Sequence, residues 1–230
     1  SVRQITNALA IAGTIVMNIL ANALPLNGQF TGDISDRFKV FFVPAGYVFS
    51  IWGLIYIGLL AFAVYQALPA RRQDAALRRI GYLPALNGIA NVAWLFFWHY
   101  NLFGWTLVAM LLILASLLAI YLRAGIGRTP VASQAERWCV RVPFSVYLGW
   151  ITVATIANVT DVLSLTTWNG WGLAPETWAV LLLAVAVLIA LAMAVTRRDA
   201  AYILVLTWAF AGIGVKQAAA PLVANAGWAA

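Results

Sequence analysis

The chain contains seven apolar stretches that are each about as long as a lipid bilayer is thick. The clearest one, Thr177–Thr196, carries no formal charge. About 20 apolar residues at a rise of about 1.5 Å each match roughly 30 Å of hydrocarbon. Because lipid offers no hydrogen-bond partner to a bare peptide group, each stretch is predicted to be a helix. The predicted spans are Gln4–Leu26, Ala45–Leu68, Ile80–Tyr100, Phe103–Leu122, Val142–Leu165, Thr177–Thr196 and Ala201–Ala224.

The composition favours one domain embedded in a membrane. Hydrophobic residues make up 64% of the chain and charged residues 9%, whereas soluble domains are nearer about 25% charged. No long polar stretch or linker divides the chain, so we predict a single integral-membrane domain over residues 1–230. The fold class is all-α, a polytopic bundle of seven transmembrane helices. The first apolar run is interpreted as a membrane helix, because it is too long for a signal peptide and lacks a small-residue cleavage site.

The basic residues are unevenly distributed between the two sides of the predicted bundle. With the N-terminus in the cytoplasm, eleven of the fourteen fall on the cytoplasmic side: Arg3, Arg71, Arg72, Arg78, Arg79, Arg123, Arg128, Arg137, Arg141, Arg197 and Arg198. Since Lys and Arg in short loops stay inside, this predicts a cytoplasmic N-terminus and an external C-terminus in a bacterial inner membrane. We interpret the arginines as topology signals and lipid headgroup contacts. No soluble basic surface is available for a nucleic-acid partner.

Three of the predicted helices carry ordered aromatic and amide motifs. In the second helix, Phe49, Trp52 and Tyr56 are spaced i, i+3, i+7 and share one face. In the third and fifth helices, Asn residues lie three or four positions from Trp or Ala on the same face. The motif residues are Pro44, Tyr47, Phe49, Trp52 and Tyr56 in the second helix, Asn91, Trp94, Phe96 and Phe97 in the third, and Val142, Pro143, Phe144, Trp150, Ala154, Thr155 and Asn158 in the fifth.

On these residues the chain resembles the TspO/MBR family, the tryptophan-rich sensory proteins related to the mitochondrial translocator protein. The resemblance covers about Gln4 to Leu165 and departs from the family pattern in several places, among them a shorter interval from Trp94 to Phe96 and a longer one from Pro143 to Trp150. Tyr47 stands where the family has Trp, one residue closer to Trp52. Family members have five helices, so residues 1–165 are predicted to form the family's core and residues 166–230 two additional transmembrane helices.

The resemblance implies binding of flat hydrophobic molecules, chiefly porphyrins and other tetrapyrroles, in a pocket capped by the loop after the first helix. Aromatic walls offer apolar area and π faces, and amides can orient a polar edge of the ligand. No cofactor is required beyond a bound tetrapyrrole or pigment, and no metal site is expected. The candidate ligand-binding residues are Tyr47, Phe49, Trp52, Tyr56, Asn91, Trp94, Phe97, Trp150, Asn158 and Lys216.

Two loops on the predicted outer side are rich in aromatic residues. Asn27–Pro44 mixes charged and aromatic residues and is expected to fold as a flap over the helix ends. Thr166–Glu176 contains two Trp between turn residues. The two loops together could form a lid; alternatively, each anchors the chain at the membrane interface.

Polar residues inside the apolar spans are costly and are therefore candidates for function. Lys216 is placed mid-way along the last span, where we expect it to pair with Asp161, to line the pocket, or to extend toward the headgroups. A Schiff-base lysine of the rhodopsin type is disfavoured, because the third and fourth helices contain no carboxylate counter-ion. Asn7, Asn18 and Asn22 are expected to make interhelical hydrogen bonds. His99 is interpreted as structural, and the single Cys139 excludes an internal disulfide.

The sequence shows no pattern typical of catalysis, and we expect no enzyme activity. It lacks a nucleophile–base pair, a metal-ligand cluster and a phosphate-binding glycine loop. The first hypothesis is a membrane protein that binds a tetrapyrrole or related pigment for sensing or transfer. The second is a non-catalytic accessory subunit of a larger membrane assembly, such as a photosynthetic pigment–protein complex; a homodimer is the other partner considered. A transporter ranks third, because no inverted repeat is visible.

Overall fold

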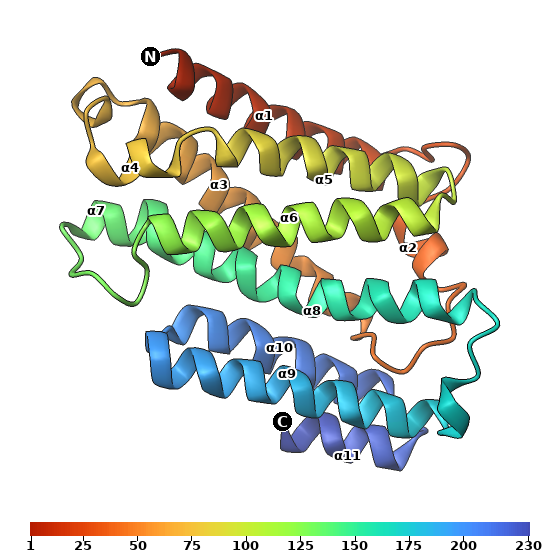
Figure 1. Cartoon of the computed structure of the whole chain (residues 1–230). Coiled ribbons are helices and arrows are strands. Elements are labelled where there is room, and N and C mark those ends of the chain that lie inside the picture. The colour runs from red at the N-terminus through yellow and green to blue at the C-terminus, as the bar shows by residue number, and fades with distance from the viewer.

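A computed structural model describes residues 1–230, and the chain is helical throughout with no β-strand (Figure 1). Seven long helices run alongside one another and are joined by short connections. The long helices are α1 (Val2–Ala23), α3 (Ile51–Ala67), α5 (Leu83–His99), α6 (Phe103–Arg123), α8 (Val142–Ser164), α9 (Pro175–Arg197) and α10 (Ala200–Lys216). The short elements are α2 (Thr31–Ser35), η1 (Gly46–Ser50), η2 (Pro69–Arg71), α4 (Ala75–Ile80), α7 (Gln134–Glu136), η3 (Arg137–Arg141), η4 (Gly170–Gly172) and α11 (Pro221–Ala229).

Five helical stretches have the length and composition of membrane spans. They are α1, the continuous η1–α3, α6, the continuous α7–η3–α8, and α9. Helix α10 is apolar but shorter, and α5 carries Pro84, Asn87 and Asn91 within its 17 residues. The protein is therefore an integral membrane protein built from apolar helices, while the crossing of all seven long helices stays a prediction.

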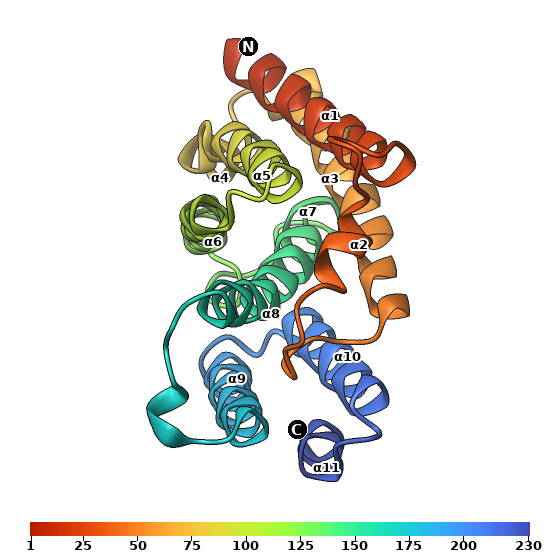
Figure 2. The same ribbon diagram turned by 90° about the vertical axis from the view of Figure 1, so that its right-hand side faces the viewer.

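The first five long helices form a closed ring. In the view along the bundle, α1 contacts α3, α3 contacts α8, and the ring continues through α6 and α5 back to α1 (Figure 2). Glycine allows close helix approach in this ring: a Cβ on Gly88 of α5 would lie 2.6 Å from Thr14 Oγ1 of α1, and one on Gly58 of α3 would lie 2.9 Å from Pro143 Cβ of α8. Small residues at helix contacts are typical of membrane bundles. Helices α9, α10 and α11 pack outside the ring, with α10 against α8.

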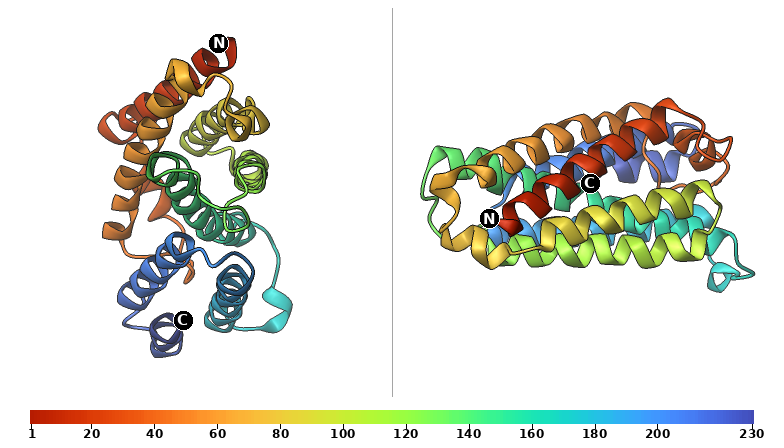
Figure 3. Two further views of the ribbon diagram at one scale, coloured as in Figure 1. Left: turned by 90° about the vertical axis from the view of Figure 1, so that its left-hand side faces the viewer. Right: turned by 90° about the horizontal axis from the view of Figure 1, so that it is seen from above.

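The predicted last span, Ala201–Ala224, is not one helix. Helix α10 ends at Lys216, a turn follows, and α11 begins at Pro221 and packs back against α9 and α10. Pro221 has no backbone N–H to donate and its ring would collide with the preceding turn, so the helix cannot continue through it. The C-terminus consequently lies part-way along the bundle and not beyond its end (Figure 3).

Two other helix boundaries differ from the predicted ones, each because of the local backbone conformation. The third span starts later than predicted, because Gly81 with φ +65° separates α4 from α5. The fifth helical stretch starts earlier, at Gln134, and passes through a π-turn, in which the N–H of Val142 bonds the carbonyl of Arg137. The π-turn directly precedes Pro143, a residue type around which helices often widen or kink.

The loop between α1 and α3 folds as the predicted flap. Helix α2 closes over the end of α5, where Phe38 stacks on Trp98 with ring centroids 5.5 Å apart and meets Phe103 edge-on. Ile34 of α2 is completely buried beneath it. We call this side of the bundle the α2 end, and the opposite side, where the helix termini carry eleven arginines, the arginine-rich end.

The second aromatic loop lies beside α9, apart from α2, so the two loops do not share a lid (Figure 2). Its indoles pack on one another: the ring centroids of Trp168, Trp171 and Trp178 are 5.2–5.8 Å apart. Trp171 is 76% exposed and holds φ at 54°, and the indole N–H of Trp178 donates to Gly170 O at 2.8 Å. Exposed tryptophans at helix ends are typical of the membrane interface, which favours the anchor interpretation.

Candidate functional site

Five aromatic side chains meet at the seam between α3 and α8, and we call them the aromatic cluster. They are Phe49, Trp52, Tyr56, Tyr147 and Trp150. The Trp52 ring stacks on Tyr56 with a centroid separation of 5.6 Å and meets Tyr147 and Trp150 edge-on at 5.8 and 6.4 Å. Phe49 meets Trp150 edge-on at 5.4 Å. Phe49, Trp52, Tyr56 and Trp150 are thus brought together as the sequence predicted.

Trp150 holds a polar atom that nothing in the chain satisfies. Its side chain is 2% exposed, and its indole Nε1 has no hydrogen-bond partner. A buried donor without an acceptor costs about 1–3 kcal/mol, and such groups are rare in folded proteins. The unpaired N–H lies within the aromatic cluster, where an acceptor on a bound molecule would satisfy it.

Tyr147 joins the aromatic cluster to an amide network inside the five-helix ring. Its hydroxyl accepts a hydrogen bond from Asn91 Nδ2 at 3.0 Å, and Asn91 Oδ1 accepts one from Asn18 Nδ2 at 2.7 Å. The three residues come from α8, α5 and α1. This confirms an interhelical bond for Asn18, whereas Asn7 donates to the carbonyl of Gly81 in the turn between α4 and α5, and Asn22 bonds within its own helix.

Asn158 and Trp94 form a second polar link nearer the α2 end. The indole N–H of Trp94 donates to Asn158 Oδ1 at 3.2 Å, and Asn158 Nδ2 lies 3.0 Å from Thr106 Oγ1. Trp94 also stacks on Trp98 at 5.0 Å, and the Trp98 N–H donates to the carbonyl of Thr31 in the flap. Asn91 therefore contacts the aromatic cluster through Tyr147, whereas Trp94 and Asn158 lie nearer the α2 end and connect to the flap through Trp98.

His99 fixes the flap to the end of α5. Its Nδ1–H donates to the carbonyl of Leu95 at 2.8 Å, so Nε2 is the acceptor facing Thr31 Oγ1 at 3.3 Å. The His99 carbonyl accepts bonds from Asn27 Nδ2 and Gln29 Nε2, both at 2.9 Å. The ring is completely buried and both nitrogens are engaged, which agrees with the structural interpretation of this residue.

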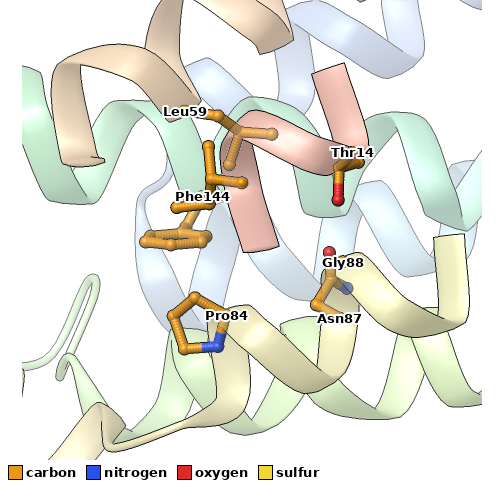
Figure 4. Close-up of a pocket in the computed structure, with 7 residues that line it drawn as sticks. Thr14, Leu59, Pro84, Asn87, Gly88 and Phe144 are labelled. Atoms are coloured by element: carbon orange, nitrogen blue, oxygen red, sulfur yellow. The ribbon is translucent and has the colours of Figure 1, made fainter. Parts of the chain in front are cut away.

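A narrow cavity lies inside the ring toward the arginine-rich side of the aromatic cluster (Figure 4). It leaves about 10 Å³ of room for a water molecule. Its walls come from α1, α3, α5 and α8: Ile11, Thr14, Leu59, Pro84, Asn87, Gly88 and Phe144. Pockets for drug-sized ligands are about 300–1,000 Å³, so a tetrapyrrole fits only if neighbouring side chains or helices move.

Two predicted site residues, Tyr47 and Phe97, lie away from the cluster. Tyr47 is 48% exposed and meets Trp208 of α10 edge-on at 5.3 Å. Phe97 pairs with Trp105 of α6 at 6.1 Å on a different face of α5. Tyr47 lies five residues before Trp52, about 140° around a helix at about 100° per residue, so helical spacing does not bring it to the Trp52 face.

Lys216 is not mid-way along a membrane span. It is the last residue of α10, and its Nζ lies 3.8 Å from Asp36 Oδ1 in the flap. The ion pair therefore forms with Asp36; Asp161, the expected partner, lies near enough for its charge to interact with that of Lys216 but makes no ion pair with it. The reason is the break before Pro221, which brings the end of α10 to the α2 end of the bundle.

Helix α10 holds the chain segment that leads from the flap into α3. The N–H of Ala45 donates to Gly212 O at 3.0 Å, the Trp208 indole donates to Val48 O at 3.2 Å, and Gln217 Nε2 donates to Phe41 O at 3.0 Å. The C-terminal helices thus fix the start of the helix that carries Trp52. No local sequence pattern predicted these contacts. Tyr147 was also missed, although its place three residues before Trp150 on α8 puts it on the same face.

No curated protein and no solved structure matches the chain. The family model described as "TSPO-like protein" matches residues 4–230, which include the five-helix ring and also α9, α10 and α11. The chain therefore belongs to the TSPO-like protein family.

Proposed function

We propose that the protein binds a flat hydrophobic molecule of the tetrapyrrole class at the aromatic cluster, for sensing or transfer within the membrane. The observation that carries the proposal is the unpaired, buried indole N–H of Trp150 among four further aromatic rings. Aromatic rings supply stacking surface, and the N–H supplies one directed donor for a carboxylate, carbonyl or ring nitrogen of the ligand. Membership of the TSPO-like family supports a membrane ligand-binding role.

The proposed ligand enters by separating α3 from α8. Trp52 and Tyr56 are half-buried at this seam, whereas Tyr147 and Trp150 behind them are buried. Displacing the outer pair would join the aromatic cluster to the cavity inside the ring. In this proposal the protein needs no cofactor and catalyses no reaction; its residues bind, orient and release the ligand.

We also propose that the N-terminus faces the cytoplasm of a bacterial cell. The arginine-rich end contains the start of α1 and the termini of α3, α6, α8 and α9, and its short connections would be retained inside by their positive charge. The flap and Lys216 would then lie on the external side.

Replacing Trp150 with phenylalanine tests the proposal, and Trp98→Phe is a matched control. Both indoles are at most 3% exposed, but the Trp98 N–H already has a partner in Thr31 O. We expect Trp150→Phe to weaken porphyrin binding about 3- to 10-fold, the value of one net hydrogen bond, while Trp98→Phe leaves it within about 2-fold. The measurement is saturable quenching of tryptophan fluorescence by a porphyrin in detergent.

In stability the order of the two variants should be reversed, with Trp98→Phe losing more unfolding free energy than Trp150→Phe. Removing the unpaired N–H of Trp150 relieves a desolvation cost that offsets the lost ring packing, so its unfolding free energy should stay within about 1 kcal/mol of the wild type. Trp98→Phe should lose more, since it leaves Thr31 O without its donor. Porphyrin binding that is equal in wild type and Trp150→Phe would contradict the proposed role of this indole.

A further inference from the structure

Two arginines at the arginine-rich end are fixed side by side. Arg79 near the end of α4 donates from Nε to the backbone carbonyl of Arg123 at 3.2 Å. Arg123 at the end of α6 donates from Nη1 to the carbonyl of Arg79, also at 3.2 Å. This reciprocal pair holds two positive charges close together, although like charges repel. Each arginine uses only one nitrogen, which leaves both Nη groups of Arg79 and the Nε and Nη2 of Arg123 available.

No carboxylate at this end of the bundle neutralises the pair. Asp74 pairs with Arg71 at 3.6 Å, and Glu136 pairs with Arg141 at 2.7 Å. The remaining acid, Asp199, is buried and accepts from the hydroxyls of Tyr121 and Ser145. Arg79 and Arg123 therefore carry uncompensated charge on an exposed surface.

A shallow hollow of about 410 Å³ adjoins the pair, and it is lined by Gln73, Ala75, Arg78 and Arg79. Arg78 is oriented by a bond from Nη1 to Gln73 Oε1 at 3.1 Å. The hollow lies where α3 has just ended and α5 is about to begin, at the level where lipid headgroups meet a membrane bundle. Two guanidinium groups, those of Arg78 and Arg79, thus border one solvent-accessible concavity, and Arg123 is held beside Arg79.

We propose that Arg78, Arg79 and Arg123 bind a phosphate group, supplied by the headgroup of an anionic lipid. Guanidinium donors match phosphate oxygens in pairs, and basic pockets between helices on the cytoplasmic side are suited to anionic headgroups. A bound phosphate would also relieve the repulsion between Arg79 and Arg123. This inference is independent of any ligand at the aromatic cluster.

The test compares an Arg79→Gln/Arg123→Gln variant with an Arg72→Gln/Arg128→Gln control. The control removes the same charge from exposed arginines whose side chains make no hydrogen bond or ion pair. Full-length protein is exchanged into a zwitterionic detergent with phosphatidylglycerol, and retained lipid is measured by native mass spectrometry. We expect the wild type and the control to retain the lipid and the test variant to retain about 30-fold less, which is the effect of two phosphate-contacting arginines at about 1 kcal/mol each.

If the glutamine variant is unstable, an Arg79→Lys/Arg123→Lys variant replaces it. Lysine preserves the charge but cannot donate two hydrogen bonds from one planar group to a phosphate, so we expect lipid retention between that of the wild type and that of the glutamine variant. In a separate experiment, inorganic phosphate is titrated into the wild type and the glutamine variant without lipid. If phosphate raises the melting temperature of the wild type but not that of the glutamine variant, and the lipid is not retained, the occupant is a free phosphate. Equal lipid loss in the test variant and the control, without a phosphate effect, would overturn the proposal.

Discussion

Asp199→Ala is expected to lower the unfolding free energy by about 3–5 kcal/mol. Asp199 is buried at the start of α10, and its Oδ2 accepts from Tyr121 of α6 at 2.7 Å and from Ser145 of α8 at 2.6 Å. Its Oδ1 caps α10 by accepting from the N–H of Tyr202 at 3.2 Å. The substitution leaves two buried hydroxyls without their acceptor, at about 1–3 kcal/mol each, and removes a cap worth about 1 kcal/mol.

Titration with a denaturing detergent, followed by circular dichroism, measures the loss. Asp33→Ala is the control, because Asp33 is exposed and its side chain makes no hydrogen bond or ion pair. Asp199→Asn should lose less, about 1 kcal/mol, since the amide oxygen can still accept from both hydroxyls and only the cap on the Tyr202 N–H is lost. If Asp199→Ala proved as stable as Asp33→Ala, Asp199 would not join the C-terminal helices to the five-helix ring.

Gly212→Leu is the second substitution with a large expected effect. A Cβ at Gly212 would overlap Val48 Cγ2 and would lie 3.1 Å from Pro44 Cβ, so a longer side chain forces α10 away from η1. The displacement would also strain the bond from the Ala45 N–H to Gly212 O. Overpacking of this kind costs about 1–3 kcal/mol, and we expect the upper part of that range.

Thermal unfolding in mild detergent measures this effect, with Gly13→Leu as the control. A Cβ on Gly13 of α1 meets no atom within 4 Å, so the same added bulk should change the melting temperature little. Because η1 leads directly into Trp52, Gly212→Leu should also weaken porphyrin binding. Equal melting temperatures for the two leucine variants would show that α10 does not hold the start of α3.

The sequence predicted the helices well because long apolar runs leave the chain in lipid few alternatives. It also predicted the face shared by Phe49, Trp52 and Tyr56, since this depends only on helical period. The prediction for Phe97 did not take helical period into account. Phe97 lies six residues after Asn91, about 240° around the helix at about 100° per residue, so the two side chains do not share a face. Asn91, Trp94 and Trp98 follow the period and do share a face.

Other features depended on tertiary contacts that no local pattern contains. Asp199 lies 78 residues from Tyr121 and 54 from Ser145 in the chain, and nothing in the sequence pairs them. Lys216 was misplaced because the apolar run continues past it, although Pro221 was the available signal for the break. A shared pocket for Trp52 and Trp150 was predicted only through family resemblance, since spacing along single helices says nothing about which helices are neighbours.

The most direct test of the account is porphyrin binding to a Trp52→Leu variant, measured by absorbance titration beside Trp105→Leu. Trp52 contacts three members of the aromatic cluster, whereas Trp105 is 59% exposed on α6 and contacts Phe97. Loss of one stacking ring, worth about 0.5–1.5 kcal/mol beyond area burial, predicts at least a several-fold weaker affinity for Trp52→Leu and an unchanged one for Trp105→Leu. Saturable binding of undiminished affinity in a folded Trp52→Leu protein would contradict a ligand site at the α3–α8 seam.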